Sequence, residues 1–354
     1  MTQTHRIDEA LQERLACGLL NYWYPVLPSW AVTTRPAGIT RLGQNVVVWR
    51  APDGEVHALE DRCPHRGARL SMGWNLGDRI ACWYHGVQVT AEGVVAEVPA
   101  VERCPMVGEK LVKRYPTREI QGAVFLYFGD ELNEMPVPLE VPEQLSNSDV
   151  YEAILCVAKW KCNYRLAIDN VMDPMHGTYL HADSHSMACG DKQAQMGSRT
   201  TDTGFIFEKK QQRGVNFDWV EWGESGAMWM RLEIPYGKSA GPGGDFGIIG
   251  MVCPVDAAHT MAFFWRYRRV TGWQRDLWRF MYRTKLEKLH WEVLEQDRRI
   301  LENLAPNSTQ HEFLYQHDVG LGRARRILEH KARLQLEAVA AHKPGAGPMN
   351  SASA

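Results

Sequence analysis

The feature that most constrains this chain is a pair of short turns in CPHRGARLSMGWNLGDRIACWYHG, residues 63–86. Each turn combines a cysteine with a histidine, as Cys63-x-His65 and Cys82-x-x-His85. Two cysteines and two histidines on two turns can hold either a zinc ion or a two-iron, two-sulfur cluster. The spacing therefore predicts a metal centre in the first third of the chain.

The residues around the two pairs favour the cluster over zinc. Pro64 and Gly67 flank the first pair, and Gly86 closes the second. Such residues let backbone N–H groups point inward at a buried anion, which bridging sulfides supply and a bare zinc ion does not. The one-residue spacing of Cys63 and His65 also differs from the two to four residues usual between zinc-finger cysteines.

The first part of the chain reads as short strands cut by turns, over residues 31–128. A hairpin with an Asp-Gly turn is predicted over 45–61, with further strand-like runs at 93–99 and 122–130. The stretch 131–149 contains three prolines and several acidic residues with little periodicity, which is typical of a linker between domains.

The second part mixes strands with helices. Helical patterns cover about 160–181, 272–304 and 319–340. The strand-like segments are 151–160, 203–212, 227–236, 247–255 and 260–270. The sequence therefore predicts an α+β fold, in which a small all-β domain is followed by an α+β domain. The basic run WRYRRV (265–270) is interpreted as a solvated face or a docking patch.

A second group of candidate ligands lies in NYRLAIDNVMDPMHGTYLHAD, residues 163–183. On a regular helix His176 and His181 would point about 140° apart. Gly177 lets the chain bend between them, and Pro174 suits the first position of a new turn. Two converging neutral imidazoles suit a divalent transition metal. In the alternative, Asp173 is an N-cap of that turn and the histidines are ordinary polar residues.

The helical pattern 272–304 contains one carboxylate where apolar residues are expected. Its predicted apolar stripe comprises Leu286, Leu289, Val293, Leu294, Ile300, Leu301 and Leu304. Asp297 falls inside this stripe, and an isolated buried carboxylate is costly unless it is paired or ligates a metal. With His176 and His181 it would complete the two-histidine, one-carboxylate triad of non-haem ferrous oxygenases. The alternative is a buried ion pair between Asp297 and an arginine.

Together these motifs resemble those of the Rieske non-haem iron oxygenases, in the terminal oxygenase (alpha) subunit. CPHRGARLSMG and CWYHG match the cluster motif, and DNVMDPMHGTYLH matches the Asn-x-x-Asp-x-x-His-x-x-x-x-His motif. EQDRRIL matches the segment that donates the carboxylate. The resemblance covers nearly the whole chain, in the motif order of the homotrimeric members. Val87 stands where many relatives have tryptophan, a departure that touches no ligand.

The resemblance implies two cofactors and two domains. A Rieske domain over 22–140 would carry one [2Fe-2S] cluster, and a catalytic domain over 146–341 would carry one mononuclear Fe(II). The catalytic domain would have an antiparallel sheet flanked by helices, in a helix-grip arrangement, and 342–354 would be a disordered tail. The implied cluster ligands are Cys63, His65, Cys82 and His85, and the implied iron ligands are His176, His181 and Asp297.

The resemblance also implies an activity and partners. Electrons from NAD(P)H would pass through a separate reductase, with or without a ferredoxin, to activate dioxygen and hydroxylate or demethylate an aromatic or related ring. In a head-to-tail homotrimer, Asp173 would link His85 of one subunit to His176 of the next. Asn170 matches the asparagine of the motif, and the identity of the substrate does not follow from it.

Composition agrees with this expectation. The net charge of −2 gives no reason to expect nucleic acid or an acidic membrane as a partner. No run approaches eighteen apolar residues, and the first twenty residues lack the pattern of a secretory signal, which predicts a cytoplasmic protein. The glycine-rich stretch 239–247 lacks the context of a dinucleotide-binding turn, so NAD(P)H is expected to bind a separate protein.

Two other functions remain open at this level. A Rieske electron-transfer protein would need only the first domain, and a zinc-binding scaffold would need neither motif in detail. The strand aromatics are ambiguous in the same way, because they suit either the wall of a substrate cavity or an ordinary core. They are Trp219, Trp222, Trp229 and Phe264.

Overall fold

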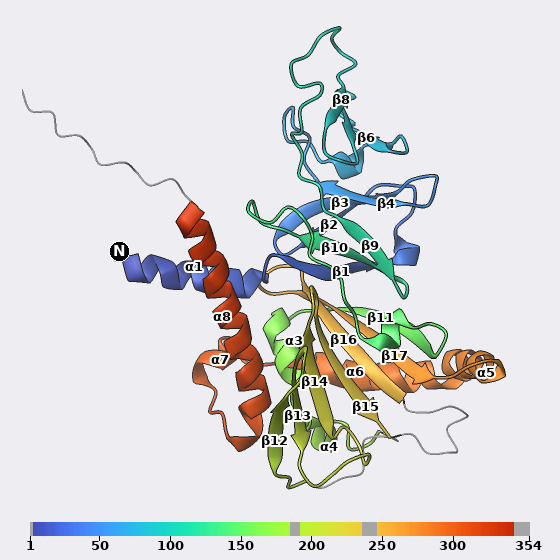
Figure 1. Ribbon diagram of the computed structural model, residues 1–354, viewed down its shortest axis with the longest axis vertical. Coiled ribbons are helices and arrows are strands. Elements are labelled where there is room, and N and C mark those ends of the chain that lie inside the picture. Colours follow the sequence, from blue (N-terminus) through green and yellow to red (C-terminus); the bar gives the residue numbers. More distant parts are fainter. Residues whose placement is uncertain (1–2, 185–191, 236–245, 343–354) are drawn as a thin grey trace, which may run out of the picture.

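The computed structural model describes residues 3–184, 192–235 and 246–342. The molecule is elongated, with a lobe of small sheets at one end of its long axis and a large sheet with its helices at the other (Figure 1). The α+β class predicted from the sequence is confirmed, since small sheets come first and one large antiparallel sheet with helices follows.

Three small antiparallel sheets build the N-terminal lobe. The predicted hairpin over 45–61 forms, with Trp49 opposite His57 and Arg50 opposite Val56. The first sheet is β1 (Tyr22–Pro28), β10 (Ala123–Phe128) and β9 (Thr117–Ile120), and the second is β2 (Ala37–Arg41), β3 (Gln44–Arg50) and β4 (Val56–Glu60). The third, at the tip, is β5 (Trp74–Asn75), β6 (Arg79–Ala81), β7 (Gln88–Thr90) and β8 (Val95–Glu97). Short 3₁₀ turns lie at Ser29–Ala31 and Leu70–Met72.

A seven-stranded antiparallel sheet dominates the other end of the molecule. The predicted linker 131–149 leads into it and includes one helical turn, α2 (Glu143–Ser146). The strand order is β11 (Tyr151–Trp160), β17 (Thr260–Arg269), β16 (Phe246–Pro254), β15 (Met228–Ile234), β14 (Trp219–Glu224), β13 (Gly204–Lys209) and β12 (Met196–Thr200). The glycine-rich stretch 239–247 falls outside the described residues except for its last two, which begin β16.

The sheet is buried on both faces, and β17 shows how. Its side chains alternate, so Ala262 and Phe264 join the core beneath the helices, while Phe263, Trp265 and Tyr267 join the core shared with β1 and β10. Phe125 of β10 stacks on Trp265, with ring centroids 6.1 Å apart. The N-terminal lobe is therefore joined to the large sheet by a continuous apolar core.

The helices differ from the predicted ones at their breaks. The pattern over 160–181 is two helices, α3 (Tyr164–Val171) and α4 (His176–Leu180), because Trp160 still belongs to β11 and the chain turns at Pro174. The pattern over 272–304 is α5 (Trp273–Met281), a π-helical turn η4 (Tyr282–Leu286) and α6 (Glu287–Glu302).

The remaining helices cover one side of the molecule. The predicted C-terminal helix is α8 (Val319–His342), after the short α7 (Ser308–His311) and a 3₁₀ turn at Gln316–Asp318. The sequence did not predict α1 (Gln3–Cys17), which crosses α8 (Figure 1). Of the predicted disordered tail, residues 343–354 lie outside the described residues.

Candidate metal centres

The two Cys–His turns fold in the same way and meet at the tip of the N-terminal lobe. In each turn the cysteine N–H donates to the carbonyl five residues later, and a glycine N–H donates back to the cysteine carbonyl. The bonds are Cys63 N to Ala68 O (2.8 Å), Gly67 N to Cys63 O (2.9 Å), Cys82 N to Val87 O (2.8 Å) and Gly86 N to Cys82 O (2.9 Å). Both glycines require positive φ, +74° and +72°, which explains their presence at the two equivalent positions.

The four candidate ligands are sorted by depth. The thiols of Cys63 and Cys82 are buried, and the rings of His65 and His85 lie at the surface with centroids 4.8 Å apart. Burial raises the pKa of Cys63 to about 11, while backbone N–H groups of His65 and Arg66 act to lower it. These two N–H groups favour the thiolate form of Cys63. The residues therefore fit a [2Fe-2S] cluster with its cysteine side buried and its histidine side at the surface.

His176, His181 and Asp297 converge in the second half of the chain. Nε2 of His176 lies 3.5 Å from Oδ1 of Asp297, and Nε2 of His181 lies 3.2 Å from the same oxygen. One nitrogen or oxygen from each residue falls within 4.8 Å of the others. His176 begins α4, His181 follows its end, and Asp297 comes from α6. Both imidazoles therefore approach one point, but the bend predicted at Gly177 is wrong, because Gly177 lies inside α4.

Each histidine makes a hydrogen bond to the protein through Nδ1. Its Nε2 atom then faces the carboxylate of Asp297. His176 Nδ1 lies 2.5 Å from the carbonyl oxygen of Asp173, and His181 Nδ1 lies 2.7 Å from Oε1 of Gln296. An Nδ1–H that donates to oxygen fixes the neutral tautomer whose Nε2 can bind a metal. The two Nε2 atoms and the carboxylate of Asp297 therefore fit the two-histidine, one-carboxylate site of mononuclear iron.

The carboxylate of Asp297 has no arginine partner among residues 3–184, 192–235 and 246–342, so the alternative of a buried Asp–Arg ion pair is wrong there. Its partners are the two histidines and Asn170, whose Nδ2 donates to Oδ1 across 3.2 Å. Burial lowers the pKa of His181, but its contacts with Asp297 and Gln296 prevail and raise it overall.

The predicted apolar stripe on α6 was correct at its centre and wrong at its end. Leu286, Leu294 and Leu301 are buried with Asp297, whereas Ile300 is 48% exposed and Leu304 41%. His290, which the sequence analysis did not consider, is buried on the same face. Ile300 lies in the last turn of α6, which ends at Glu302, and Leu304 lies beyond that end.

Asp173 makes the capping contact that the sequence offered as the alternative. Its Oδ1 accepts the N–H of Met175 at 2.8 Å, and its Oδ2 lies 4.0 Å from His176 Nδ1. Its side chain remains 28% exposed, so the capping contact leaves one carboxylate oxygen accessible.

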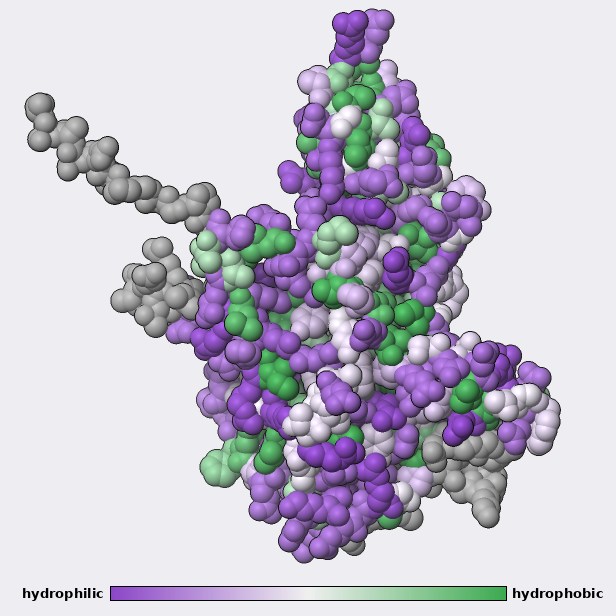
Figure 2. Space-filling view, viewed as in Figure 1, coloured by the Kyte–Doolittle hydropathy of each residue, from purple (hydrophilic) through white to green (hydrophobic). Residues whose placement is uncertain are grey.

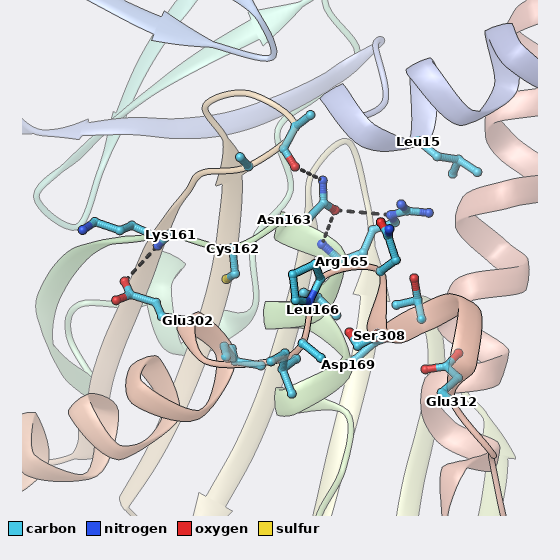
Figure 3. Close-up of a pocket in the computed structure, with 18 of the residues that line it drawn as sticks. Leu15, Lys161, Cys162, Asn163, Arg165, Leu166, Asp169, Glu302, Ser308 and Glu312 are labelled. Carbon is cyan, nitrogen blue, oxygen red and sulfur yellow. Dashed lines mark hydrogen bonds between the residues drawn. The ribbon is translucent and has the colours of Figure 1, made fainter.

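A hollow of about 560 Å³ lies beside α3 (Figure 3). Asp169 lines it and binds Arg325 of α8 (2.7 Å), whereas the next residue, Asn170, faces Asp297. None of His176, His181 and Asp297 lines this hollow. It is therefore distinct from the candidate iron site.

The aromatic residues considered as cavity walls are all buried. Trp222 and Phe264 belong to the core beneath the helices, and Trp229 belongs to the core on the other face of the sheet. Trp219 lies between Arg213 and Arg231, whose guanidinium groups are 4.7 and 5.1 Å from its ring. Phe217, which the sequence did not single out, packs edge-on against His176, with ring centroids 5.6 Å apart.

Two family models match the two halves in which these sites lie. Residues 22–116 match the Rieske [2Fe-2S] domain, and residues 160–334 match the vanillate O-demethylase oxygenase C-terminal domain. The chain belongs to the Rieske oxygenase family. A Rieske oxygenase carries a [2Fe-2S] cluster and a mononuclear iron, and each matched region holds one of the two ligand sets described above.

Curated relatives match over part of their length. The terminal oxygenase component of carbazole 1,9a-dioxygenase from Metapseudomonas resinovorans is 34% identical over 191 residues, 50% of this chain and 49% of that protein. The vanillate O-demethylase oxygenase subunit of Pseudomonas sp. (strain HR199 / DSM 7063) is 34% identical over 165 residues, 46% of this chain and 45% of that protein. The matches thus span about half the length of these relatives.

Solved structures share the fold over nearly the whole chain. A carbazole-bound oxygenase in complex with ferredoxin, from carbazole 1,9a-dioxygenase, has a TM-score of 0.76 at 22% identity and covers 96% of this chain and 98% of that chain. Dicamba monooxygenase bound to dicamba has a TM-score of 0.70 at 20% identity and covers 90% of this chain and 98% of that chain. In the described ranges, no helix is both long and apolar enough to cross a membrane.

Proposed function

We propose that this Rieske oxygenase is the terminal oxygenase component of a multi-protein system that hydroxylates or demethylates an aromatic or related ring. The observation that carries the proposal is the convergence of His176, His181 and Asp297 in the domain that lacks the Cys–His turns. A pure electron-transfer protein would need only those turns. When bound, the cluster supplies single electrons and the mononuclear iron supplies dioxygen activation.

We assign Cys63, His65, Cys82 and His85 to the cluster, and His176, His181 and Asp297 to the iron. The protein side chains orient the ligands: Gln296 and the Asp173 carbonyl hold the imidazoles, and Asn170 holds the carboxylate. Buried thiols keep water from the cysteine side of the cluster, whereas the exposed imidazole edge offers a path for electrons.

A homotrimer in which the two sites of neighbouring subunits meet is part of the proposal. Within one chain the Cys–His turns follow β4 and β6 near the tip of the lobe, whereas α4 lies at the opposite end of the long axis (Figure 1). Apolar residues gather on the visible face of this lobe (Figure 2). Exposed large side chains around the turns are Met72, Trp74, Leu76, Trp83 and Tyr84. A patch of this kind beside the histidine edge suits contact with another protein.

The donor of electrons is proposed to be a separate NAD(P)H-dependent reductase, directly or through a ferredoxin. Related oxygenases bound to a ferredoxin, with the same fold, support such a partner. We also keep the cytoplasmic location inferred from the sequence as part of the proposal. The names of relatives do not fix the substrate, because they include carbazole, vanillate and 3-chlorobenzoate.

Metal analysis of the purified chain tests the proposal. We expect about three irons and two acid-labile sulfides per chain. Asp297→Ala should lose about one iron and all oxygenated product while keeping both sulfides, since a site with two protein ligands binds iron weakly. Glu292→Ala, which removes an exposed carboxylate from the same helix, is the matched control. Full iron content in Asp297→Ala, or zinc in place of iron in the wild type, would refute the assignment.

A further inference from the structure

Arg266 is a buried cation whose guanidinium is only partly bonded. It lies in β17 on the face covered by the helices and is 1% exposed. Its Nη2 donates to the carbonyl oxygen of His290 in α6, at 3.0 Å. Its Nε and Nη1 have no hydrogen-bond partner in the part of the chain that the structure describes. Buried guanidinium groups are normally paired, so we expect a hydrogen-bond acceptor to bind at Nε and Nη1 of Arg266.

The surroundings of Arg266 are apolar and aromatic. In the sheet it lies between Ile154 of β11 and Ile248 of β16, its direct register partners. Tyr282 of the π-helical turn packs against His290, the two ring centroids being 5.5 Å apart. The hydroxyl of Tyr282 is 3.4 Å from Cys156 Sγ. A π-helical turn inside a helix is frequent at functional sites. Here it carries Tyr282, whose pKa burial raises and the nearby charge of Arg266 acts to lower.

Within the described ranges, no carboxylate forms an ion pair with Arg266. The carboxylate nearest to it in the sheet register belongs to Glu152, which stands opposite Arg268. Arg279 holds that carboxylate at 2.7 Å, and Arg275 lies 3.8 Å from it. Arg268 itself is buried beside Arg266 on the same face of β17, over the ring of Trp278.

The position of Arg266 relative to the iron site is fixed by α6. His290, whose carbonyl binds Arg266, and Asp297 lie on the same buried face of that helix. Seven residues of α-helix span roughly 10 Å. The apolar side chain of Leu294 lies between them on that face. An aromatic ring with an acid group at one end would match this arrangement, in which a positive charge, an apolar side chain and the candidate iron ligands follow one another along α6.

We propose that Arg266 binds the acid group, a carboxylate or sulfonate, of an aromatic substrate and so selects aromatic acids over neutral rings. The inference rests on the proposed oxygenase function, which it deepens by naming the substrate class. A guanidinium with spare N–H donors suits a planar or tetrahedral oxyanion, and a neutral ring would leave those donors unbonded in an apolar site. Arg266 is in this view a specificity-determining residue that touches the substrate away from the reacting carbon.

The test compares aromatic acids with their uncharged counterparts on the whole protein. Substituted benzoates and benzenesulfonates, each with its primary amide, are titrated calorimetrically into the reduced holoprotein without dioxygen. We expect acids to bind at least about tenfold more tightly than amides, the usual effect of one charge-assisted hydrogen bond. Equal affinity of acid and amide across the panel would overturn the proposal without any variant.

Variants then locate the effect. Arg266→Gln should abolish the acid preference, so that each acid binds no more tightly than its amide, and Arg266→Lys should restore part of the preference. Arg269→Gln removes an exposed charge from the same strand and should keep the full preference. An acid preference that survives in Arg266→Gln would place the anion elsewhere and refute the assignment. Acids that bind but yield no oxygenated product would refute the proposed function and leave this inference intact, whereas product from neutral rings alone would do the reverse.

Discussion

The side-chain amide of Asn170 donates to Oδ1 of Asp297 across 3.2 Å, joining α3 to α6 at the candidate iron site. The same oxygen lies 3.2 Å from His181 Nε2 and 3.5 Å from His176 Nε2. Because one carboxylate oxygen meets both imidazoles and an amide, the amide fixes how the carboxylate is turned. This gives the motif's asparagine a role that the sequence left unassigned.

Asn170→Ala is therefore expected to weaken iron binding rather than abolish it. Loss of a group that orients a metal ligand typically lowers affinity or activity by about 10- to 100-fold. Iron occupancy measured against a chelator series, with sulfide content as the internal reference, checks this. Asn303→Ala is the control, because Asn303 is an exposed residue at the end of the same α6 helix. Unchanged iron affinity in Asn170→Ala would show that the amide only packs.

The cluster assignment predicts a selective spectroscopic loss. His85→Ala should eliminate the Rieske-type electron paramagnetic resonance signal, since a histidine-ligated iron is what raises the potential of such clusters. Tyr84→Ala is the matched variant, because it removes the ring packed 3.9 Å from the His85 ring but no proposed ligand. The signal should persist in Tyr84→Ala. An intact signal in His85→Ala would mean that another residue ligates the iron.

The sequence predicted most of what determines the two centres, because local chemistry encodes them. Gly67 and Gly86 adopt positive φ, and Pro174 lies at the break between α3 and α4. Asp297 was an anomaly in an apolar pattern. Each of these signals depends on a few neighbouring residues, so no knowledge of the tertiary structure was needed.

What the sequence did not predict depends on partners far along the chain. The basic run 265–270 was interpreted as a solvated face or a docking patch, and this was wrong for Arg266 and Arg268, which are buried. Strand alternation from Ala262 and Phe264 would have placed both arginines on the helix-covered face. Gln296 could not be identified as the partner of His181, because its contact spans 115 positions.

The ion pair between Arg325 and Asp169 is expected to stabilise α3 against α8. Arg325 Nη2 lies 2.7 Å from Asp169 Oδ2, and the same guanidinium binds Glu312. Burial lowers the pKa of Arg325, whereas the carboxylates of Glu312 and Asp169 raise it. The effect of the carboxylates is the larger one. Arg325→Met would leave Asp169, 12% exposed, without its counter-charge. We expect a loss of about 1–3 kcal/mol in unfolding free energy, less than for a fully buried pair because Arg325 is partly solvated.

Chemical denaturation of Arg325→Met and of a control variant measures this loss of unfolding free energy. Arg333→Met is the control, since Arg333 and Glu329 form an exposed pair on the same helix. Removing that pair should change the unfolding free energy by less than about 0.5 kcal/mol. Equal effects of Arg325→Met and Arg333→Met would indicate that the buried pair contributes nothing special to the packing of α3.

The last prediction concerns Asp173, which has two roles to separate. Its Oδ1 caps the turn before α4 through the N–H of Met175, and its side chain is still 28% exposed beside His176. In Asp173→Asn the amide oxygen can still accept from Met175, so the turn and both metals should remain, because asparagine caps as well as aspartate does. What is lost is the negative charge.

If Asp173 only caps, Asp173→Asn should oxidise its reduced cluster at the wild-type rate when substrate and dioxygen are mixed in. If it links His85 of one subunit to His176 of the next, as we propose, that single-turnover rate should fall by about 10- to 100-fold, the usual effect of removing a carboxylate that orients a metal-bound histidine. Asp202→Asn removes an exposed charge from the same domain and should behave as wild type. Stopped-flow traces recorded alongside iron content and trimer mass distinguish the two roles. The bridging role requires a slow trace with full metal content and an intact trimer, because only then does the defect lie in the contact between subunits and not in the folding of either site.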